Sequence, residues 1–446
     1  MPTDLSRRNF LRNLCGGTAA GAVLAPLTLR ADASLAAIKG AADAPTEAEF
    51  WARVRGEFLV TDEVAYMNNG TLGPTPKPVY YTVVERYREL AADPGSRNPI
   101  QEKAAEEVRR KAAAFVGADP EEIALLRNTT EAMSFIAGGL ELSAGDEVLL
   151  TFHEHPGGLE PWRLKAKRHG VVLKELRFPI PTPDPAAILN LFADAITPRT
   201  RVISVSHFTY QTGSGVPAKE LAQLARSKGI LSVVDGAHPL GMMKLDLHDL
   251  GADFYAMSPH KWLDAPTGTG LLYARRESQE RLWPTVVTSA IPYPAGGADW
   301  ANPQKGAMRF DRFSQRAWPL VLATGAAIDF QNAIGRERIE ARVRGLAALL
   351  RARLQELPGV RIYTSDHPAL CCGLTGFTFE GLKNTDVMET LLQRNHVRVR
   401  TTEYGLNTVR ASTHYYNTEE QVERLAEGLR EIPRRGVVAA RAGADD

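Results

Sequence analysis

The stretch of sequence that decides the fold is VVDGAHPLGMMKLDLHDLGADFYAMSPHKWLDAPTGTGLLY, residues 233–273. It contains two apolar runs of strand length, and each run ends in polar residues, the first at Asp235 and the second at Ser258, His260 and Lys261. Nearly continuous apolar runs are typical of strands in a parallel sheet, because helices cover both faces of such a sheet. Neighbouring parallel strands end at the same edge, so we expect the carboxylate of Asp235 and the amine of Lys261 to face one crevice.

The same alternation of short apolar runs and amphipathic helical runs extends back to about residue 120. Helical spacing is clear in PAKELAQLARSKG, residues 217–229, and four more strands are predicted at EIALLRN, DEVLLTFHEH, VVLKELRF and RVISVSHF. This alternation predicts an α/β domain with a large, doubly wound, mostly parallel sheet. After Trp318 a long charged helix is followed by short strands and further helices, which predicts a smaller α+β C-terminal domain.

The overall composition is that of a globular protein. The 446 residues include 53 basic and 52 acidic side chains, which gives a formal net charge of +1, and 44% of the residues are hydrophobic. No basic stripe interleaved with aromatic residues is present, and this argues against a nucleic acid partner. The weakly apolar run near the N-terminus is shorter than the ~20 residues that a spanning helix needs, so no stable membrane span is expected.

The N-terminus has the features of an export signal. Ser6–Leu11 reads S-R-R-x-F-L, a weakly apolar run follows over Cys15–Leu29, and small residues at Ala31, Ala33 and Ala36 offer A-x-A-like cleavage sites. This arrangement resembles a twin-arginine signal peptide. It predicts a protein that the twin-arginine machinery exports, and that is periplasmic or secreted.

The other two cysteines, Cys371 and Cys372, are adjacent within the apolar stretch PALCCGLTGFTF. We expect buried thiols here, because a disulfide between neighbouring residues would be strained. No Cys/His spacing typical of a metal site occurs in the sequence, so no metal is predicted.

The combination of Asp235 with Lys261 suits the cofactor pyridoxal 5'-phosphate (PLP). A lysine amine forms a Schiff base with this cofactor, and a carboxylate keeps its pyridine nitrogen protonated, so that the ring can withdraw electrons from the substrate Cα. Each residue alone would more often be a turn residue or a solvated side chain. Their occurrence at the ends of neighbouring strands is what indicates the cofactor.

The motifs VDGAH, SPHKW and PTGTG, with YMNNGTLGPTP upstream and VRASTHYYNTEEQVERL downstream, resemble the class V aminotransferase family of fold type I PLP enzymes. The resemblance extends from about Tyr66 to Leu429. It implies catalytic roles for Lys261, Asp235 and His155, an amino-acid-like substrate and a homodimer.

Together, these patterns divide the chain into five parts. They are a signal peptide at 1–36, an N-terminal segment over the active site at 37–75, a large PLP-binding domain at 76–315, a small domain at 316–433 and a disordered tail at 434–446.

The resemblance also assigns contacts to the cofactor phosphate. In RNTTEAMSFI, the turn formed by Asn128, Thr129 and Thr130 precedes a helix, whose free N–H groups and dipole suit an anion. Ser258 and His260 match further phosphate contacts of the family.

Three more residues match positions around the cofactor. His155, in EHP, matches the imidazole that stacks on the pyridine ring, although strand alternation alone does not separate it from His153. His238 matches the position that donates to the phenolic oxygen of the cofactor. Gln315, in RFDRFSQR, stands near the position that commonly reaches the phosphate in the neighbouring subunit.

Substrate contacts are predicted at three positions. Arg410, in VRAS, matches the arginine whose planar guanidinium binds the substrate α-carboxylate with two parallel hydrogen bonds. Arg400 is a second candidate at the mouth of the site. Asn69 belongs to the segment that folds back over the active site in this family.

These residues favour an aminotransferase that acts at Cα of an amino acid. An isopenicillin-N-epimerase-like racemase is the first alternative, a PLP-dependent lyase is less favoured, and a PLP-fold binding protein without turnover is the non-enzyme alternative. Transamination is preferred because epimerisation needs a second acid or base, and the sequence shows none unambiguously. Family desulfurases carry a cysteine between the segments that here read VRVRT and VRAS; residues 402–408, TEYGLNT, contain none, which predicts that the enzyme is not a cysteine desulfurase.

The export signal can be tested by changing Arg7 and Arg8 together to lysine. We expect the double variant to accumulate in the cytoplasm, because twin-arginine recognition distinguishes the two cations. Fractionation followed by immunoblotting measures the distribution. Equal export of the variant and the wild type would contradict the twin-arginine prediction.

Overall fold

The computed structural model describes residues 27–41, 43–95, 98–182, 184–286, 306–311, 315–403 and 405–440. The twin-arginine motif lies outside these ranges, so the signal and the export remain predictions. The first described helix, α2 (Leu27–Ala41), overlaps the predicted cleavage region and packs against α4 (Lys77–Ala92). Among the described residues, none of the helices combines the length and apolar character that a membrane crossing requires.

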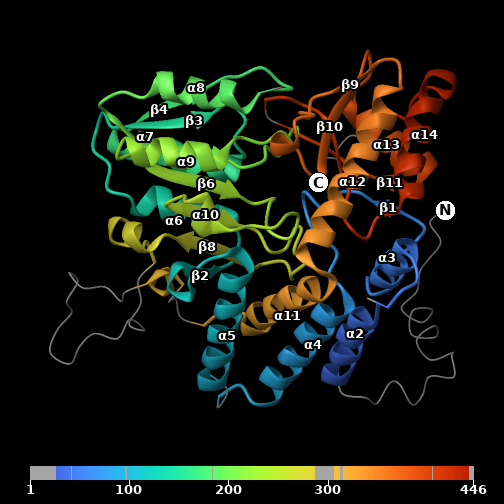
Figure 1. The fold of residues 1–446 in the computed structure, drawn as a ribbon, viewed down its shortest axis with the longest axis horizontal. Helices are drawn as coiled ribbons and strands as arrows, with labels where there is room; N and C mark the ends of the chain where they lie inside the picture. Colours follow the sequence, from blue (N-terminus) through green and yellow to red (C-terminus); the bar gives the residue numbers. More distant parts are fainter. Residues whose placement is uncertain are drawn as a thin grey trace.

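A seven-stranded sheet forms the larger part of the molecule, on the left in Figure 1, in the order β2-β8-β7-β6-β5-β3-β4. The strands are β2 (Ile123–Leu126), β3 (Glu147–Thr151), β4 (Val172–Leu176), β5 (Thr200–Ser206), β6 (Leu231–Gly236), β7 (Phe254–Met257) and β8 (Gly270–Ala274). All neighbours are parallel except β8, which is antiparallel to both β2 and β7. The fold class and the six strands predicted from apolar runs are confirmed, whereas β8, directly after the Gly/Pro/Thr turn, was not among them.

Helices cover both faces of this sheet, and successive side chains of a strand enter two different cores. Ile203 and Val234 belong to the core beneath α5 (Asn98–Val116), α8 (Pro185–Ala195), α9 (Ala218–Ser227) and α11 (Trp318–Ile334). Val202 and Val233 belong to the core beneath α6 (Thr129–Gly139) and α7 (Pro156–His169). Burial on both faces is the reason that the strands read as continuous apolar runs.

The smaller part, orange to red in Figure 1, contains a four-stranded antiparallel sheet in the order β12-β13-β10-β9. Its elements are α12 (Arg336–Gln355), β9 (Val360–Ile362), β10 (Leu374–Phe379), α13 (Asn384–Asn395), β12 (Arg400–Thr401), β13 (Val409–Ser412) and α14 (Glu419–Arg435). Leu350, Phe377 and Leu425 lie at the centre of its core. In the segment predicted as a tail, the Val438 amide donates to Thr390 Oγ1 at 2.8 Å.

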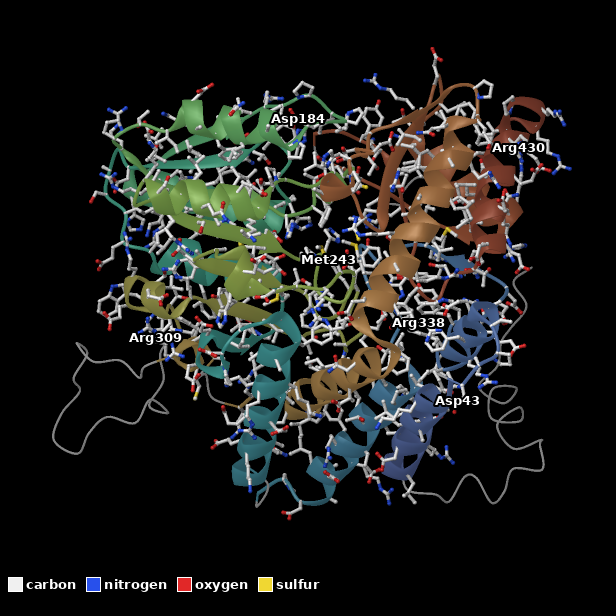
Figure 2. All side chains as sticks on the ribbon, viewed as in Figure 1. Asp43, Asp184, Met243, Arg309, Arg338 and Arg430 are labelled. Carbon is white, nitrogen blue, oxygen red and sulfur yellow. The ribbon has the colours of Figure 1, made fainter. Side chains whose placement is uncertain are left out.

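Among the short strands predicted after Trp318, the run HVRVRT, residues 396–401, is divided in two. Its first half, β11 (Val397–Arg398), pairs in parallel with β1 (Ala65–Tyr66), whereas β12 pairs with β13. The N-terminal segment is therefore hydrogen-bonded to the small domain. A further core, which includes Phe58, Trp262 and Tyr415, joins these parts. Met243 packs against this core and against the core beneath α9, and it is labelled between the two parts in Figure 2.

A buried ion pair connects α5 to the segment before α11. Asp311 Oδ2 lies 2.8 Å from Arg109 Nη1, and both side chains are almost fully buried. The same oxygen accepts from the Leu125 amide at 2.6 Å. Arg109 also pairs with the partly exposed Glu106 at 3.0 Å, so removal of Asp311 takes away the buried one of its two partners.

We expect Asp311→Ala to lower the free energy of unfolding by about 3–5 kcal/mol, because Arg109 loses its buried partner. Urea titration followed by circular dichroism measures the change. Asp329→Ala is the matched control, since its ion pair with Lys111 is partly exposed and is worth only about 0–1 kcal/mol. Equal losses in the two variants would contradict the role assigned to burial.

Candidate active site

A cavity of about 370 Å³ lies at the carboxyl ends of β2, β3, β6 and β7. This volume is within the range of small-molecule sites, roughly 300–1,000 Å³. Ten of the predicted site residues line the cavity: Asn128, Thr129, Thr130, His155, Asp235, Ser258, His260, Lys261, Arg400 and Arg410. Asn69, His238 and Gln315 are not among the lining residues.

The turn after β2 has the form of an anion site. Asn128 is the N-cap of α6, and its Oδ1 accepts from the Glu131 amide at 2.8 Å, which leaves the first N–H groups of the helix free for a ligand. Thr129 Oγ1 lies 2.7 Å from Ser258 Oγ, so the hydroxyls from two strand ends meet there. The backbone is tightly packed at this point, since a Cβ on Gly270 would lie 2.3 Å from the Asn128 nitrogen. These residues fit a phosphate group.

Lys261 lies on the turn after β7, and its amine is enclosed in the cavity. Burial lowers the pKa of Lys261 to about 8, because a charged ammonium is poorly solvated there. The nearby carboxylate of Asp235 opposes this effect, and the Arg410 guanidinium adds to it. An amine with this pKa is partly neutral near pH 7, as a nucleophile or a base must be.

Asp235 ends β6 at the base of the cavity. Its Oδ1 accepts from the Ala237 amide at 3.0 Å, and a Cβ on Gly158 would lie 3.0 Å from its Oδ2. Burial raises the pKa of Asp235, and the positive charge of Lys261 counteracts the shift. A cationic partner at Oδ2 would favour the ionised carboxylate, and a protonated pyridine nitrogen is such a partner.

His155 lies in the cavity, and the alternative His153 does not. His155 is the N-cap of α7, and its Nδ1 accepts from the Gly157 amide at 3.0 Å. Burial and the charge of Lys261 lower the pKa of His155 to about 3, which keeps the imidazole neutral and able to stack on a ring. His153 instead packs against Phe178 and is not among the residues that line the cavity.

His238 is buried beside the cavity. Its Nδ1 accepts from Trp262 Nε1 at 3.2 Å, so in the neutral ring the proton is on Nε2. Burial and the charge of Lys261 hold the pKa of His238 well below its usual value. The predicted donation from this ring to a phenolic oxygen needs a proton on Nε2, but the contact itself remains a prediction.

Arg410 is fully enclosed and is held by the N-terminal segment. Its Nη1 donates to the Tyr210 carbonyl at 3.0 Å, and its Nη2 donates to Asn68 Oδ1 at 3.2 Å and Thr71 Oγ1 at 2.7 Å. The Gly70 amide donates to Ser412 Oγ at 3.0 Å, which fixes this segment beside β13. Thr71 was not predicted, although it follows Gly70 directly in the motif that indicated the segment.

Asn69 supports the site from behind. Its Nδ2 lies 3.3 Å from Asp264 Oδ1 and 3.5 Å from the Lys261 carbonyl, and Tyr416 donates to its Oδ1. Its amide is therefore bonded to partners within the chain, and the substrate contact predicted for it remains a prediction. Asp264 Oδ2 also accepts from Tyr415 at 2.8 Å, so this buried carboxyl joins three parts of the chain.

Gln315 is exposed and does not line the cavity of the single chain. The contact predicted for it needs a second subunit, and both the contact and the homodimer remain predictions.

Glu154 is a buried carboxyl that was not singled out from the sequence. Its Oε1 accepts from Thr151 Oγ1 at 2.5 Å and its Oε2 accepts from Ser206 Oγ at 2.7 Å. Burial raises the pKa of Glu154 to about 7, and the charge of Asp235 adds to the shift. The adjacent strand ends thus place a second carboxyl behind Asp235.

Cys371 and Cys372 are buried thiols, as predicted. Burial raises the pKa of Cys372 to about 12.

The sheet, the enclosed lysine and the phosphate-type turn define a fold type I PLP enzyme. Residues 65–425 match the family described as aminotransferase class-V, and the chain belongs to this family. Members of this class hold pyridoxal 5'-phosphate, and the residues around Lys261 fit that cofactor.

The proteins that are similar to this chain include both epimerases and cysteine desulfurases. The chain is 35% identical to an isopenicillin N epimerase of Streptomyces clavuligerus over 387 residues, which cover 85% of this chain and 97% of the relative. It is 31% identical to a cysteine desulfurase of Cronobacter sakazakii over 416 residues, which cover 86% and 98%. A solved structure of a C-DES mutant with glycine covalently linked to the PLP cofactor has a TM-score of 0.76 and 26% identity, and covers 84% of this chain and 98% of that one.

The similarity to cysteine desulfurases corrects the prediction that set this enzyme apart from them. That prediction rested on one loop, residues 402–408, which contains no cysteine. The similarity to the Cronobacter sakazakii desulfurase extends over 86% of the chain, far beyond that loop. One loop therefore does not separate the chain from the desulfurases.

We expect Lys261→Ala to fold but to lose the visible absorbance of the lysine-bound cofactor. Turnover should fall by at least about 10²-fold, the lower end of what a general acid or base contributes. Absorption spectra and amino-acid turnover measure the two effects. Lys244→Ala is the control, because Lys244 is exposed and pairs with Glu337. A Lys261→Ala enzyme with normal turnover would overturn the assignment of the site.

Proposed function

We propose that this chain is a PLP-dependent enzyme that removes and returns the proton at Cα of an amino acid, with epimerisation as the favoured outcome. The observation that carries the proposal is that Lys261, which is half-buried, lines the cavity with a pKa of about 8. Such an amine changes its protonation state near neutral pH, as a general base at Cα must. The 35% identity to an isopenicillin N epimerase supports inversion as the outcome.

Each of the cavity residues has a separate role in the proposed reaction. When bound, pyridoxal phosphate supplies the electron-withdrawing ring that makes the Cα proton of an attached amino acid acidic. Arg410 orients the substrate through its α-carboxylate, and Asp235 holds a proton at the ring nitrogen. His155, neutral because its pKa is about 3, covers the ring without adding positive charge. Lys261 moves the proton at Cα on one face, and inversion requires a second acid that returns a proton on the opposite face.

Carbon–sulfur bond cleavage is the second candidate, and the relationship to cysteine desulfurases favours it. It uses the same cofactor and the same arginine, but the substrate is cysteine or a related sulfur amino acid. Transamination, which was favoured from the sequence, uses the same first proton transfer and differs in where the proton returns.

The experiment is incubation of the purified holoenzyme with a panel of amino acids in heavy water, with and without a keto-acid acceptor. We expect deuterium at Cα together with inversion, and no keto acid. Chiral chromatography and mass spectrometry measure both. Formation of a keto acid would show transamination in place of epimerisation. Formation of alanine from cysteine, together with released or protein-bound sulfur, would establish carbon–sulfur bond cleavage. Absence of any Cα exchange across the panel would refute the proposal.

A further inference from the structure

Two arginines on neighbouring strands line the cavity side by side. β12 and β13 are antiparallel, and their register places Arg400 directly opposite Arg410. Side chains at directly opposite positions project from the same face of a sheet, a few ångströms apart. Both arginines line the cavity.

Neither guanidinium is neutralised by the described part of the chain. The three hydrogen bonds of Arg410 go to a backbone carbonyl, an amide oxygen and a hydroxyl, all of them uncharged. Burial lowers the pKa of Arg410 to about 10, and the charge of Arg400 adds to this shift. Arg400 forms no hydrogen bond or ion pair with any residue that the structure describes.

Other arginines of the small domain show the usual arrangement. Arg342 pairs with Glu419, and Arg353 lies 2.8 Å from Glu423. Like charges at directly opposite positions of a sheet are unfavourable unless a group of opposite charge lies between or beside them. An anionic ligand would therefore stabilise the unpaired guanidinium of Arg400.

The carboxylates of the cavity do not supply that charge. Asp235 lies at the base of the cavity, beside the amine of Lys261. Glu403 lines the cavity, but its hydrogen bond is made by its carbonyl, which accepts from Tyr210 at 2.7 Å. A carboxylate carried by the substrate would supply the missing negative charge beside Arg400.

We infer that Arg400 binds a second carboxylate of the substrate, so that the substrate is an α-amino acid with an acidic side chain. This inference rests on the proposed function, in which Arg410 binds the α-carboxylate. The two guanidiniums then hold the two ends of one dianion, and Arg400 selects acidic over neutral side chains. The planar guanidinium suits this task because it can bind a carboxylate with two parallel hydrogen bonds.

The first experiment compares matched pairs of amino acids with the holoenzyme: aspartate with asparagine, glutamate with glutamine and 2-aminoadipate with norleucine. At least one acidic member should exchange its Cα proton with a KM about 10- to 100-fold lower than its neutral partner, as expected for a charged hydrogen bond. Arg400→Gln should remove this preference by raising KM for the acidic member, with KM for the neutral member unchanged. Arg400→Lys should restore part of it.

Arg398→Gln is the matched control, because Arg398 is exposed, lies two residues away and does not line the cavity. It should keep the preference for the acidic member. Unchanged cofactor absorbance of each variant shows that the site has folded.

The second experiment measures binding without turnover. Calorimetry with the holoenzyme should show tighter binding of glutarate or adipate than of butyrate or pentanoate, and Arg400→Gln should abolish the difference. Equal binding of diacids and monoacids by the wild type would overturn the inference. Equal weakening of both by Arg400→Gln would also overturn it, because both arginines would then bind one carboxylate. Selective diacid binding without any Cα exchange would refute the proposed function and leave the role of Arg400 intact.

Discussion

The carboxyl group of Asp264 is the point on which the three parts of the molecule depend. It lies three residues after Lys261, is fully buried, and accepts hydrogen bonds from Tyr415 of the small domain and Asn69 of the N-terminal segment. Burial holds the pKa of Asp264 well above its usual range. A buried carboxyl is stable only when its oxygens have partners, so the turn that carries Lys261 is held in place by two distant segments. The position of the Lys261 amine is thus set by contacts with these two segments.

The sequence was informative where a single strand determines the outcome. Asp235 and Lys261 end apolar runs, and a strand end fixes the place of the next few residues, so these residues could be predicted to meet. The same holds for Thr129 and Ser258, whose hydroxyls lie 2.7 Å apart. Two-sided burial made the central strands β5, β6 and β7 visible as apolar runs.

Other assignments depend on side-chain direction, which the pattern does not contain. Asn69 was expected to face the substrate, but its amide turns to Asp264, 195 residues away in the chain. Strand alternation did not separate His153 from His155, whereas in the structure His153 packs against Phe178 and His155 lines the cavity. The division of residues 396–401 between β11 and β12 arises because two different strands, β1 and β13, pair with its two halves. The distinction from desulfurases failed because one loop does not represent the site as a whole.

The pairing of β1 with β11 and of Gly70 with Ser412 has a consequence for synthesis of the chain. Gly70 and Ser412 are 342 residues apart, so the N-terminal segment leaves the ribosome long before its partner exists. At ~5–20 residues per second this delay is roughly 20 to 70 s. During that time Ala65 and Met67, both fully buried in the folded protein, have no core to enter. The growing chain therefore presents an apolar segment that a chaperone can bind, and Arg410 reaches its partners in the N-terminal segment only at the end of translation.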